Sequence, residues 1–172
     1  MSSLRFFLIL IIGISLPLSN AIEAAGGEEV GVKAVSPSAA HKILSENPTA
    51  ILVDVRSQAE YQFVGHPLNA CNIPMTFWNP ARYDFEPNPR FAADLTARFA
   101  KDVPLLFICR SGGRSEKAAR EAVALGFGEV YNVTEGFEGE TDSQGLRTIN
   151  GWKNSGLIYT YEVKEELKYR GP

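Results

Sequence analysis

One segment of the chain combines cysteine, glycine and arginine in a pattern suited to nucleophilic chemistry. Residues 109–115 read Cys-Arg-Ser-Gly-Gly-Arg-Ser. Gly112 and Gly113 allow positive φ angles, so that successive backbone N–H groups can point to one place. The helix that we expect from Ser115 onward would direct its N-terminus, with unpaired N–H donors and partial positive charge, to the same place. The pattern therefore predicts an anion cradle around the thiol of Cys109.

Charged side chains near Cys109 favour its ionised form. Arg110 and Arg114 each carry a full positive charge, and Lys117 follows on the expected helix. Positive charge and a helix N-terminus stabilise the thiolate, which is the nucleophilic form of cysteine. The alternative is that Cys109 is a small core residue at the end of a strand, as free cysteines usually are. Two glycines and two arginines serve no packing purpose directly after a strand, so we favour the functional interpretation.

Apolar runs and helix-start signals on both sides of the segment indicate an α/β fold. We expect strands over residues 50–54, 69–73, 104–108 and 129–133, and helices over residues 37–45, 89–101 and 115–125. Ser36-Pro37 and Asn88-Pro89 each pair an N-cap residue with proline at the first helical position. Strands that alternate with helices predict a single domain with an open parallel sheet, right-handed crossovers and helices on both faces. Ligands bind beyond the carboxyl ends of such strands, which is where Cys109 falls.

The chain resembles the rhodanese family over nearly all of its length after the N-terminal segment. The first group of matching residues is Leu52-Val53-Asp54-Val55-Arg56, Glu60-Tyr61, Gly65-His66 and Asn72-Ile73-Pro74. The second group is Phe107-Ile108 with residues 109–115, Ala118-Ala119, Leu125-Gly126-Phe127 and Val130-Tyr131-Asn132-Val133. The resemblance implies a rhodanese-like open parallel sheet and a sulfurtransferase. Cys109 would accept a sulfane sulfur from a donor such as thiosulfate, carry it as a persulfide and pass it to a thiophilic acceptor.

The resemblance also implies which residues surround the persulfide. The substrate-binding residues would be Arg110, Ser111, Gly112, Gly113, Arg114 and Ser115, with Arg114 closing the loop. Cysteine-dependent phosphatases and arsenate reductases of the same general fold place five residues between cysteine and arginine, whereas four separate Cys109 from Arg114. The shorter loop makes a smaller cradle, which suits a persulfide sulfur better than a tetrahedral phosphate.

Three further residues are candidates for supporting roles. Asp54 and Arg56 lie at the end of an expected strand, near the cysteine loop, and we favour an ion pair that fixes loop and strand over direct chemistry. His66 matches the family's Gly-His pair, whose imidazole is implied to be mainly a structural hydrogen-bonding group. We assign no general base, because a thiolate needs none. The two separated histidines and two cysteines predict no metal-ligand cluster, and we expect no cofactor.

Cys71 and Cys109 are the two cysteines of the chain, and a disulfide would be the default in an exported protein. The resemblance implies a topology in which at least one strand separates them. Neighbouring strands lie about 4.8 Å apart, so a skipped strand puts the cysteines roughly 10 Å apart, whereas a disulfide needs α-carbons within about 7 Å. We therefore predict two free thiols.

Two segments depart from the family pattern and leave the substrate open. Residues 74–90 contain four prolines among aromatic residues. They are either a surface loop whose aromatic side chains cover part of the core or a wall over the Cys109 pocket that sets the choice of acceptor. Residues 140–147 are polar and delay the family's tryptophan until Trp152. We interpret them as an inserted exposed loop, which could also border the site.

The first residues have the layout of a signal peptide. One positive charge, Arg5, precedes the apolar run 6–16, and Ser19 and Ala21 are the small residues before a cut after Ala21. The run is too short to span a bilayer, so we expect no stable membrane insertion; an uncleaved anchor is the alternative. Either interpretation puts the folded part outside the cytoplasm, in the periplasm or secreted. The expected divisions are a signal peptide (1–21), a flexible leader (22–32), a rhodanese-like domain (33–160) and a C-terminal tail (161–172).

Charge and composition limit the partners. The formal net charge is −3 and would become −4 without Arg5, and no run of lysine and arginine is present, which argues against nucleic acid. We expect a small sulfur-containing anion as donor and a thiol or cyanide-like acceptor, for which an exported protein is a candidate. The alternative to an enzyme is a non-enzymatic sulfur carrier or a protein-binding rhodanese module in the periplasm.

Overall fold

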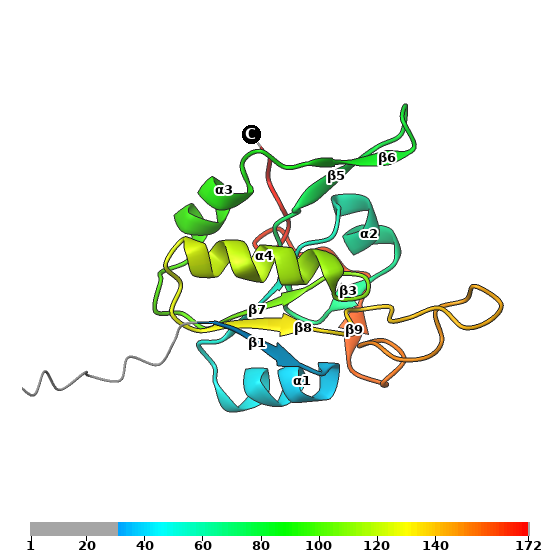
Figure 1. Ribbon diagram of the computed structural model, residues 1–172, viewed down its shortest axis with the longest axis horizontal. Helices are drawn as coiled ribbons and strands as arrows, with labels where there is room; N and C mark the ends of the chain where they lie inside the picture. The colour runs from blue at the N-terminus through cyan, green and yellow to red at the C-terminus, as the bar shows by residue number, and fades with distance from the viewer. Residues whose placement is uncertain (1–30, 172) are drawn as a thin grey trace, which may run out of the picture.

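Five parallel strands form the central sheet of the protein. The structure, a computed structural model, describes residues 31–171. In spatial order the strands are β1 (Val32–Val35), β8 (Val130–Val133), β7 (Leu105–Ile108), β2 (Ile51–Asp54) and β4 (Cys71–Asn72). All four pairings are parallel, so the predicted open parallel sheet is confirmed (Figure 1).

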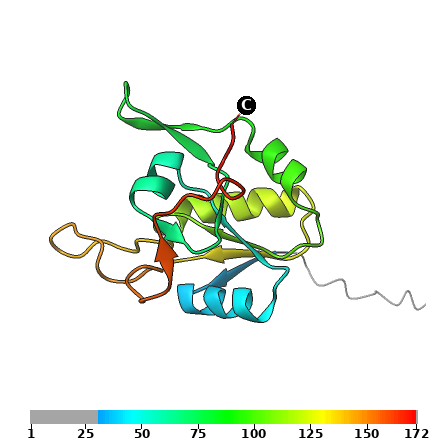
Figure 2. The same ribbon diagram turned by 180° about the vertical axis from the view of Figure 1, so that it is seen from behind.

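Helices cover both faces of this sheet. They are α1 (Pro37–Glu46), α2 (Gln58–Phe63), α3 (Phe91–Arg98) and α4 (Gly113–Ala124). Leu105 and Phe107 of β7 pack in one core cluster with α3 and α4, whereas Leu106 and Ile108 pack in a second cluster with α1. Figures 1 and 2 show α1 alone on its face and the other three helices on the opposite side. Burial on both faces explains why β7 is a continuous apolar run. Of the helices described, none is long and apolar enough to cross a membrane.

The helix starts follow the predicted signals at α1 but not at α3. Ser36 caps α1, since its side chain accepts the N–H of Ala39 at 3.2 Å. α3 begins at Phe91, two residues later than expected, because Asn88 is buried and uses its side chain to bond Pro74 O and Arg90 N instead of capping a helix. The helix also ends at residue 98 and not at residue 101.

The start of α4 also differs from the prediction, in a way that matters for the site. The helix begins at Gly113 and not at Ser115, so Gly113 and Arg114 belong to its first turn and not to the preceding loop. Gly112 occupies the N-cap position with a φ angle of 97°. A side chain at Gly112 would collide with the backbone of Thr134, so glycine is required at this point.

Both ends of the described chain contact edge strands of the central sheet or extend it. β1 begins at Val32, inside the expected leader, and pairs along the whole of β8. The remaining expectations for residues 1–30 lie outside the described residues. Near the other end, β9 (Tyr159–Thr160) pairs with β3 (His66–Pro67), and Leu167 O accepts the N–H of Asn72 at 2.8 Å. The expected C-terminal tail therefore covers the edge of β4.

Residues 74–90 form an antiparallel hairpin and not an irregular loop. Its strands are β5 (Thr76–Asn79) and β6 (Asp84–Pro87), and Figures 1 and 2 show it projecting from the body of the protein. Trp78 contacts Tyr83 and Phe85 edge to face. Phe77 lies against Tyr169, so only part of the aromatic surface faces the rest of the protein.

The two cysteines are free and lie on opposite sides of β2. Cys71 is in β4 and Cys109 follows β7, and β2 pairs with both strands. The prediction of two unpaired thiols is confirmed.

Candidate active site

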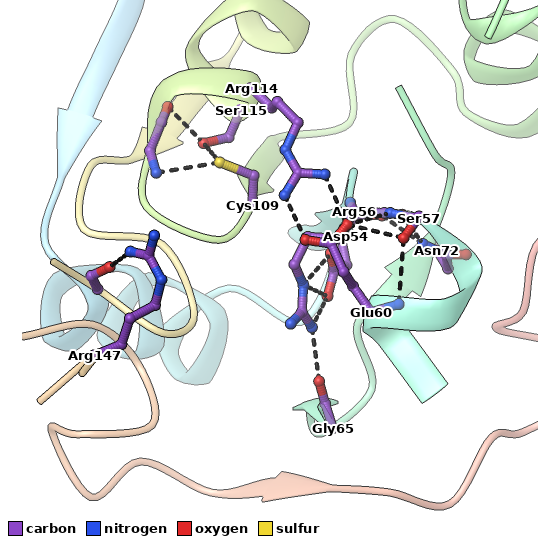
Figure 3. Close-up of polar contacts among 12 residues, drawn as sticks. Asp54, Arg56, Ser57, Glu60, Gly65, Asn72, Cys109, Arg114, Ser115 and Arg147 are labelled. Atoms are coloured by element: carbon purple, nitrogen blue, oxygen red, sulfur yellow. Dashed lines mark hydrogen bonds and ion pairs between the residues drawn. The ribbon is translucent and has the colours of Figure 1, made fainter. Parts of the chain in front are cut away.

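Cys109 lies at the carboxyl edge of the sheet, directly after β7, and its residue is 2% exposed. Its Sγ accepts a hydrogen bond from the backbone N–H of Gly112 at 3.1 Å. The hydroxyl of Ser115 lies 3.4 Å from the same sulfur and 2.9 Å from Gly112 O (Figure 3). Because a hydroxyl has one proton and rotates freely, Ser115 can donate to either acceptor. The sulfur therefore lies among donors from the loop and from the first turn of α4.

Residues 136–139 run beside the cysteine loop and bind its carbonyl groups. The N–H of Phe137 donates to Cys109 O at 2.8 Å, and the next two N–H groups donate to Arg110 O at 3.0 and 3.1 Å. In a planar trans peptide the N–H points away from the C=O. The N–H groups of Arg110 and Ser111 are thus directed away from this segment. This orientation, together with the unpaired first-turn N–H groups of α4, gives the loop the character of an anion cradle.

The close approach of the segment after β8 to the cysteine loop also requires a glycine at one position of that segment. Gly136 has a φ angle of 66°, and a side chain there would lie 2.6 Å from Cys109 O. In the same way, the backbone of Thr134 leaves no room for a side chain at Gly112. The cysteine loop and the segment after β8 are therefore packed backbone to backbone.

Arg114 is bound to a carboxylate of α2. Its Nη1 and Nη2 donate to the two carboxylate oxygens of Glu60 at 2.8 and 2.6 Å, and the ring of Phe85 lies 5.1 Å from the guanidinium carbon. Burial opposes ionisation of Glu60, but the hydrogen bonds and charge of Arg114 outweigh it and hold the pKa of Glu60 below its ordinary value. Arg114 thus joins α4 to α2, and its charge is paired with that of Glu60.

Glu60 is a site residue that the sequence interpretation missed. It also forms a capping box with Ser57, whose backbone N–H donates to the Glu60 carboxylate at 3.0 Å. The pattern Ser-x-x-Glu before a helix was the available signal for the cap. Nothing in that pattern indicates Arg114 as the second partner.

Asp54 and Arg56 form a fully buried ion pair at the end of β2. Arg56 Nη2 lies 2.6 Å from Asp54 Oδ2 and donates to Gly65 O at 2.7 Å, while the guanidinium carbon lies 4.3 Å from the Phe137 ring. In Figure 3 these contacts run between the pair and the backbone, not to Cys109. The structure therefore shows the ion pair that we favoured, in the strand next to β7.

His66 is buried in β3 and faces Tyr61. Its Nδ1 lies 2.9 Å from Tyr61 O, and the two rings stack with centroids 3.5 Å apart. Burial lowers the pKa of His66, so the neutral imidazole is favoured. This arrangement fits a structural hydrogen-bonding group and gives no role as a base.

Two other arginines belong to the surroundings of the loop: Arg110 is exposed and Arg147 is half-buried. Arg110 and Ser111 of the loop are exposed, as is Gly113. Arg147, from the expected inserted loop, donates from Nη1 to Gly139 O and lies beside the cysteine loop in Figure 3. The sequence indicated that this loop could border the site but did not single out Arg147.

A parallel sheet that carries a cysteine loop between a central strand and a helix N-terminus, with four residues between Cys109 and Arg114, is the arrangement expected of a rhodanese-like domain. The family model "Rhodanese-like domain" matches residues 36–141. The chain belongs to this family.

Solved and curated relatives agree with this membership. The crystal structure of Rv0390 from M. tuberculosis superposes with a TM-score of 0.68 at 36% identity, covering 76% of this chain and 98% of that chain. Uncharacterized protein RP600 of Rickettsia prowazekii is 32% identical over 131 residues, which are 76% of this chain and 98% of that protein. Thiosulfate sulfurtransferase GlpE of Pseudomonas entomophila is 34% identical over 106 residues, 62% of this chain and 82% of that protein. The chain is thus a rhodanese-like protein with sulfurtransferases among its relatives.

Proposed function

We propose that the protein is a sulfurtransferase that carries a sulfane sulfur as a persulfide on Cys109. The observation that supports this most is the setting of the Cys109 sulfur, which accepts the N–H of Gly112 at 3.1 Å beside the first turn of α4. Such donors stabilise negative charge on a sulfur atom and on a second sulfur attached to it.

The proposed reaction has two displacement steps. The thiolate of Cys109 attacks the outer sulfur of a donor such as thiosulfate; the S–S bond of the donor breaks, and sulfite leaves with the electron pair. A nucleophilic acceptor then attacks the outer sulfur of the persulfide, and the Cys109 thiolate leaves. Cyanide becomes thiocyanate, whereas a thiol loses its proton to solvent and becomes a persulfide. Neither step needs an external oxidant or a cofactor, as expected for covalent catalysis by a single nucleophile.

The other site residues are assigned positioning roles. The backbone of residues 110–115 forms the cradle, and the contact of Arg114 with Glu60 holds the first turn of α4 in place. The buried pair of Asp54 and Arg56 fixes the end of β2 beside β7.

The donor, acceptor and compartment also belong to the proposal. A thiosulfate-like anion is the donor and a thiol or cyanide-like molecule the acceptor, in the periplasm or a secreted setting. The support for export is the signal-peptide layout of residues 1–21, and nucleic acid is not a proposed partner.

A second candidate function is a sulfur carrier or binding module for an exported protein. The β5–β6 hairpin favours it, because Trp78 is 40% and Tyr83 is 82% exposed while Phe85 reaches Arg114 beside the site. Slow turnover with cyanide but complete persulfide transfer to a co-purifying protein would support this second function over the first.

Cyanolysis kinetics test the leading proposal. With thiosulfate and cyanide varied together, we expect thiocyanate to form with the parallel reciprocal plots of a ping-pong cycle. Cys109→Ser should form none, and Cys71→Ser should match the wild type. Intersecting plots, or equal activity in Cys109→Ser, would contradict a covalent Cys109 intermediate.

A further inference from the structure

The positive charges nearest the cysteine loop are not equally available to an anion. Arg56 is paired with Asp54 and Arg114 with Glu60, so each of these guanidinium groups faces a carboxylate. Within residues 31–171, neither Arg147 nor Arg110, the exposed arginine of the loop, forms an ion pair. Of these two, Arg147 is the one whose guanidinium group is held in place by a hydrogen bond. Its charge is therefore left to interact with another group.

Arg147 is attached to the backbone that supports the cysteine loop. Its Nη1 donates to Gly139 O, and the N–H of Gly139 donates to Arg110 O at 3.1 Å. Only one residue thus stands between the guanidinium group and the loop. Figure 3 shows Arg147 on the opposite side of Cys109 from Arg114, with the guanidinium end of the side chain nearer the loop.

The inserted loop is folded in a way that fixes Arg147. Thr141 and Arg147 form an antiparallel bridge, and the side-chain amide of Asn154 donates to Arg147 O at 3.1 Å. Neither acidic residue of this loop pairs with Arg147: Glu140 forms no ion pair with it, and the carboxylate of Asp142 accepts the N–H of Leu146 at 2.9 Å and the hydroxyl of Thr148 at 2.7 Å. The loop therefore holds Arg147 in position without supplying a counter-ion.

We propose that Arg147 binds the anionic end of the sulfur donor and selects donors that carry sulfonate-type oxygens. A guanidinium group has five N–H donors, of which Gly139 O uses one, and its planar arrangement matches pairs of oxygen atoms on an anion. A donor whose outer sulfur faces Cys109 directs its charged oxygens away from that sulfur, where a guanidinium group near the loop can bind them. Because the anion is taken to be the sulfur donor, this assignment rests on the proposed function.

Alkylation of Cys109 tests the assignment without any sulfur transfer. Iodoacetate carries a carboxylate and iodoacetamide is its neutral counterpart, so the ratio of their rates reports recognition of negative charge. In Arg147→Gln we expect the rate with iodoacetate to fall about tenfold, the loss expected for one charge-assisted hydrogen bond, while the rate with iodoacetamide is unchanged. Arg147→Lys should keep part of the preference.

Arg120→Gln is the matched control for charge. Arg120 lies on α4, its side chain is 73% exposed, and it pairs with Glu116. We expect this variant to leave both alkylation rates unchanged. If the alkylation rates with both reagents fell equally in Arg147→Gln, Arg147 would have a structural role and the assignment would be overturned. If the rate with iodoacetate alone also fell in Arg120→Gln, the effect would be one of general charge, which would overturn the assignment as well.

Steady-state kinetics connect the anion site to the reaction. In Arg147→Gln the KM for thiosulfate should rise about tenfold with kcat unchanged, while the KM for a neutral organic trisulfide stays the same. A rise for both donors would overturn the assignment. Selective loss of iodoacetate reactivity in a protein that forms no persulfide would instead support the anion site and reject the proposed function.

Discussion

At the scale of single residues, the two cysteines show how surroundings decide chemistry. Both are 2% exposed. Cys109 accepts the N–H of Gly112, whereas burial raises the pKa of Cys71 to about 11. Cys71 also lines a cavity of about 400 Å³ together with Ile51 and Phe99. The reactivity of Cys71 is therefore limited by the ionisation of its thiol more than by access to it, because the thiolate is the reactive form.

This contrast predicts selective alkylation. In the native protein near neutral pH, we expect iodoacetamide to label Cys109 and to leave Cys71 unlabelled, because the raised pKa of Cys71 keeps it protonated until the pH approaches 11. Peptide mapping by mass spectrometry after a timed reaction gives the two rates. Equal labelling of both cysteines would contradict the account, and unfolding in urea should make both react.

At the scale of elements, the site depends on how α2, α4 and the segment after β8 meet the cysteine loop. Glu60 joins the cap of α2 to Arg114 in the first turn of α4, and both side chains are mostly buried. Gly112 and Gly136 permit backbone contact on the other side of the loop. Disturbing either contact should affect stability and reactivity together.

The contact between α2 and α4 gives a prediction with a defined pH dependence. Glu60→Gln should lower the free energy of unfolding by about 1–3 kcal/mol near pH 7, because Arg114 loses its ionic partner. The pKa of Glu60 is lowered in the folded state, so its contribution is complete above the ordinary value of 4.5 and is lost as the pH falls through the folded value. Urea unfolding of both proteins from pH 7 to pH 3 should show the difference shrinking with acidity; a difference that grows would contradict it.

The two adjacent glycines of the loop offer a matched comparison. Gly112→Ala should destabilise the protein by about 2 kcal/mol or more, because the new side chain meets Thr134 and the φ angle is 97°. Gly113→Ala should be tolerated, since its side chain would meet no atom within 4 Å. Thermal unfolding of both variants checks this, and similar losses in the two would count against the backbone contact.

At the scale of the whole molecule, the centre of the sheet was predictable and its margins were not. β2, β7 and β8 were expected to within one residue, and burial on both faces gives β2 and β7 their continuous apolar runs. β1 and the β5–β6 hairpin are partly exposed and lack that pattern. The position of the cysteine loop was also predictable, because its residues are contiguous.

The side-chain contacts around the cysteine loop could not be predicted from the sequence, for a physical reason. Arg114 and Glu60 lie 54 positions apart, and Arg147 reaches the loop through a segment that no local pattern orients. Only the tertiary structure, which joins Glu60 of α2 to Arg114 of α4 and Arg147 to Gly139, brings these side chains to the surroundings of the cysteine loop. Long-range pairing of this kind is decided by tertiary structure and not by propensity.

The C-terminal segment predicts a stability effect that a free tail would not have. A chain ending at Tyr161 should lose about 2 kcal/mol or more of unfolding free energy, because it lacks the contacts of Leu167 and Tyr169 and exposes the edge of β4. Tyr169→Phe, which loses only the hydrogen bond to Asp94, should cost about 1 kcal/mol. Urea unfolding gives both values, and an unchanged midpoint in the shortened chain would show that the segment is dispensable.

The central claim is that Cys109 holds a transferable sulfur atom, and the mass of its peptide tests this most directly. After treatment with thiosulfate and removal of the excess, the peptide that contains Cys109 should gain about 32 Da, the mass of one sulfur atom in a covalent intermediate. Cyanide should remove the added mass, and the peptide that contains Cys71 should not change. An unmodified Cys109 in protein that remains folded, or the same gain on Cys71, would contradict the account.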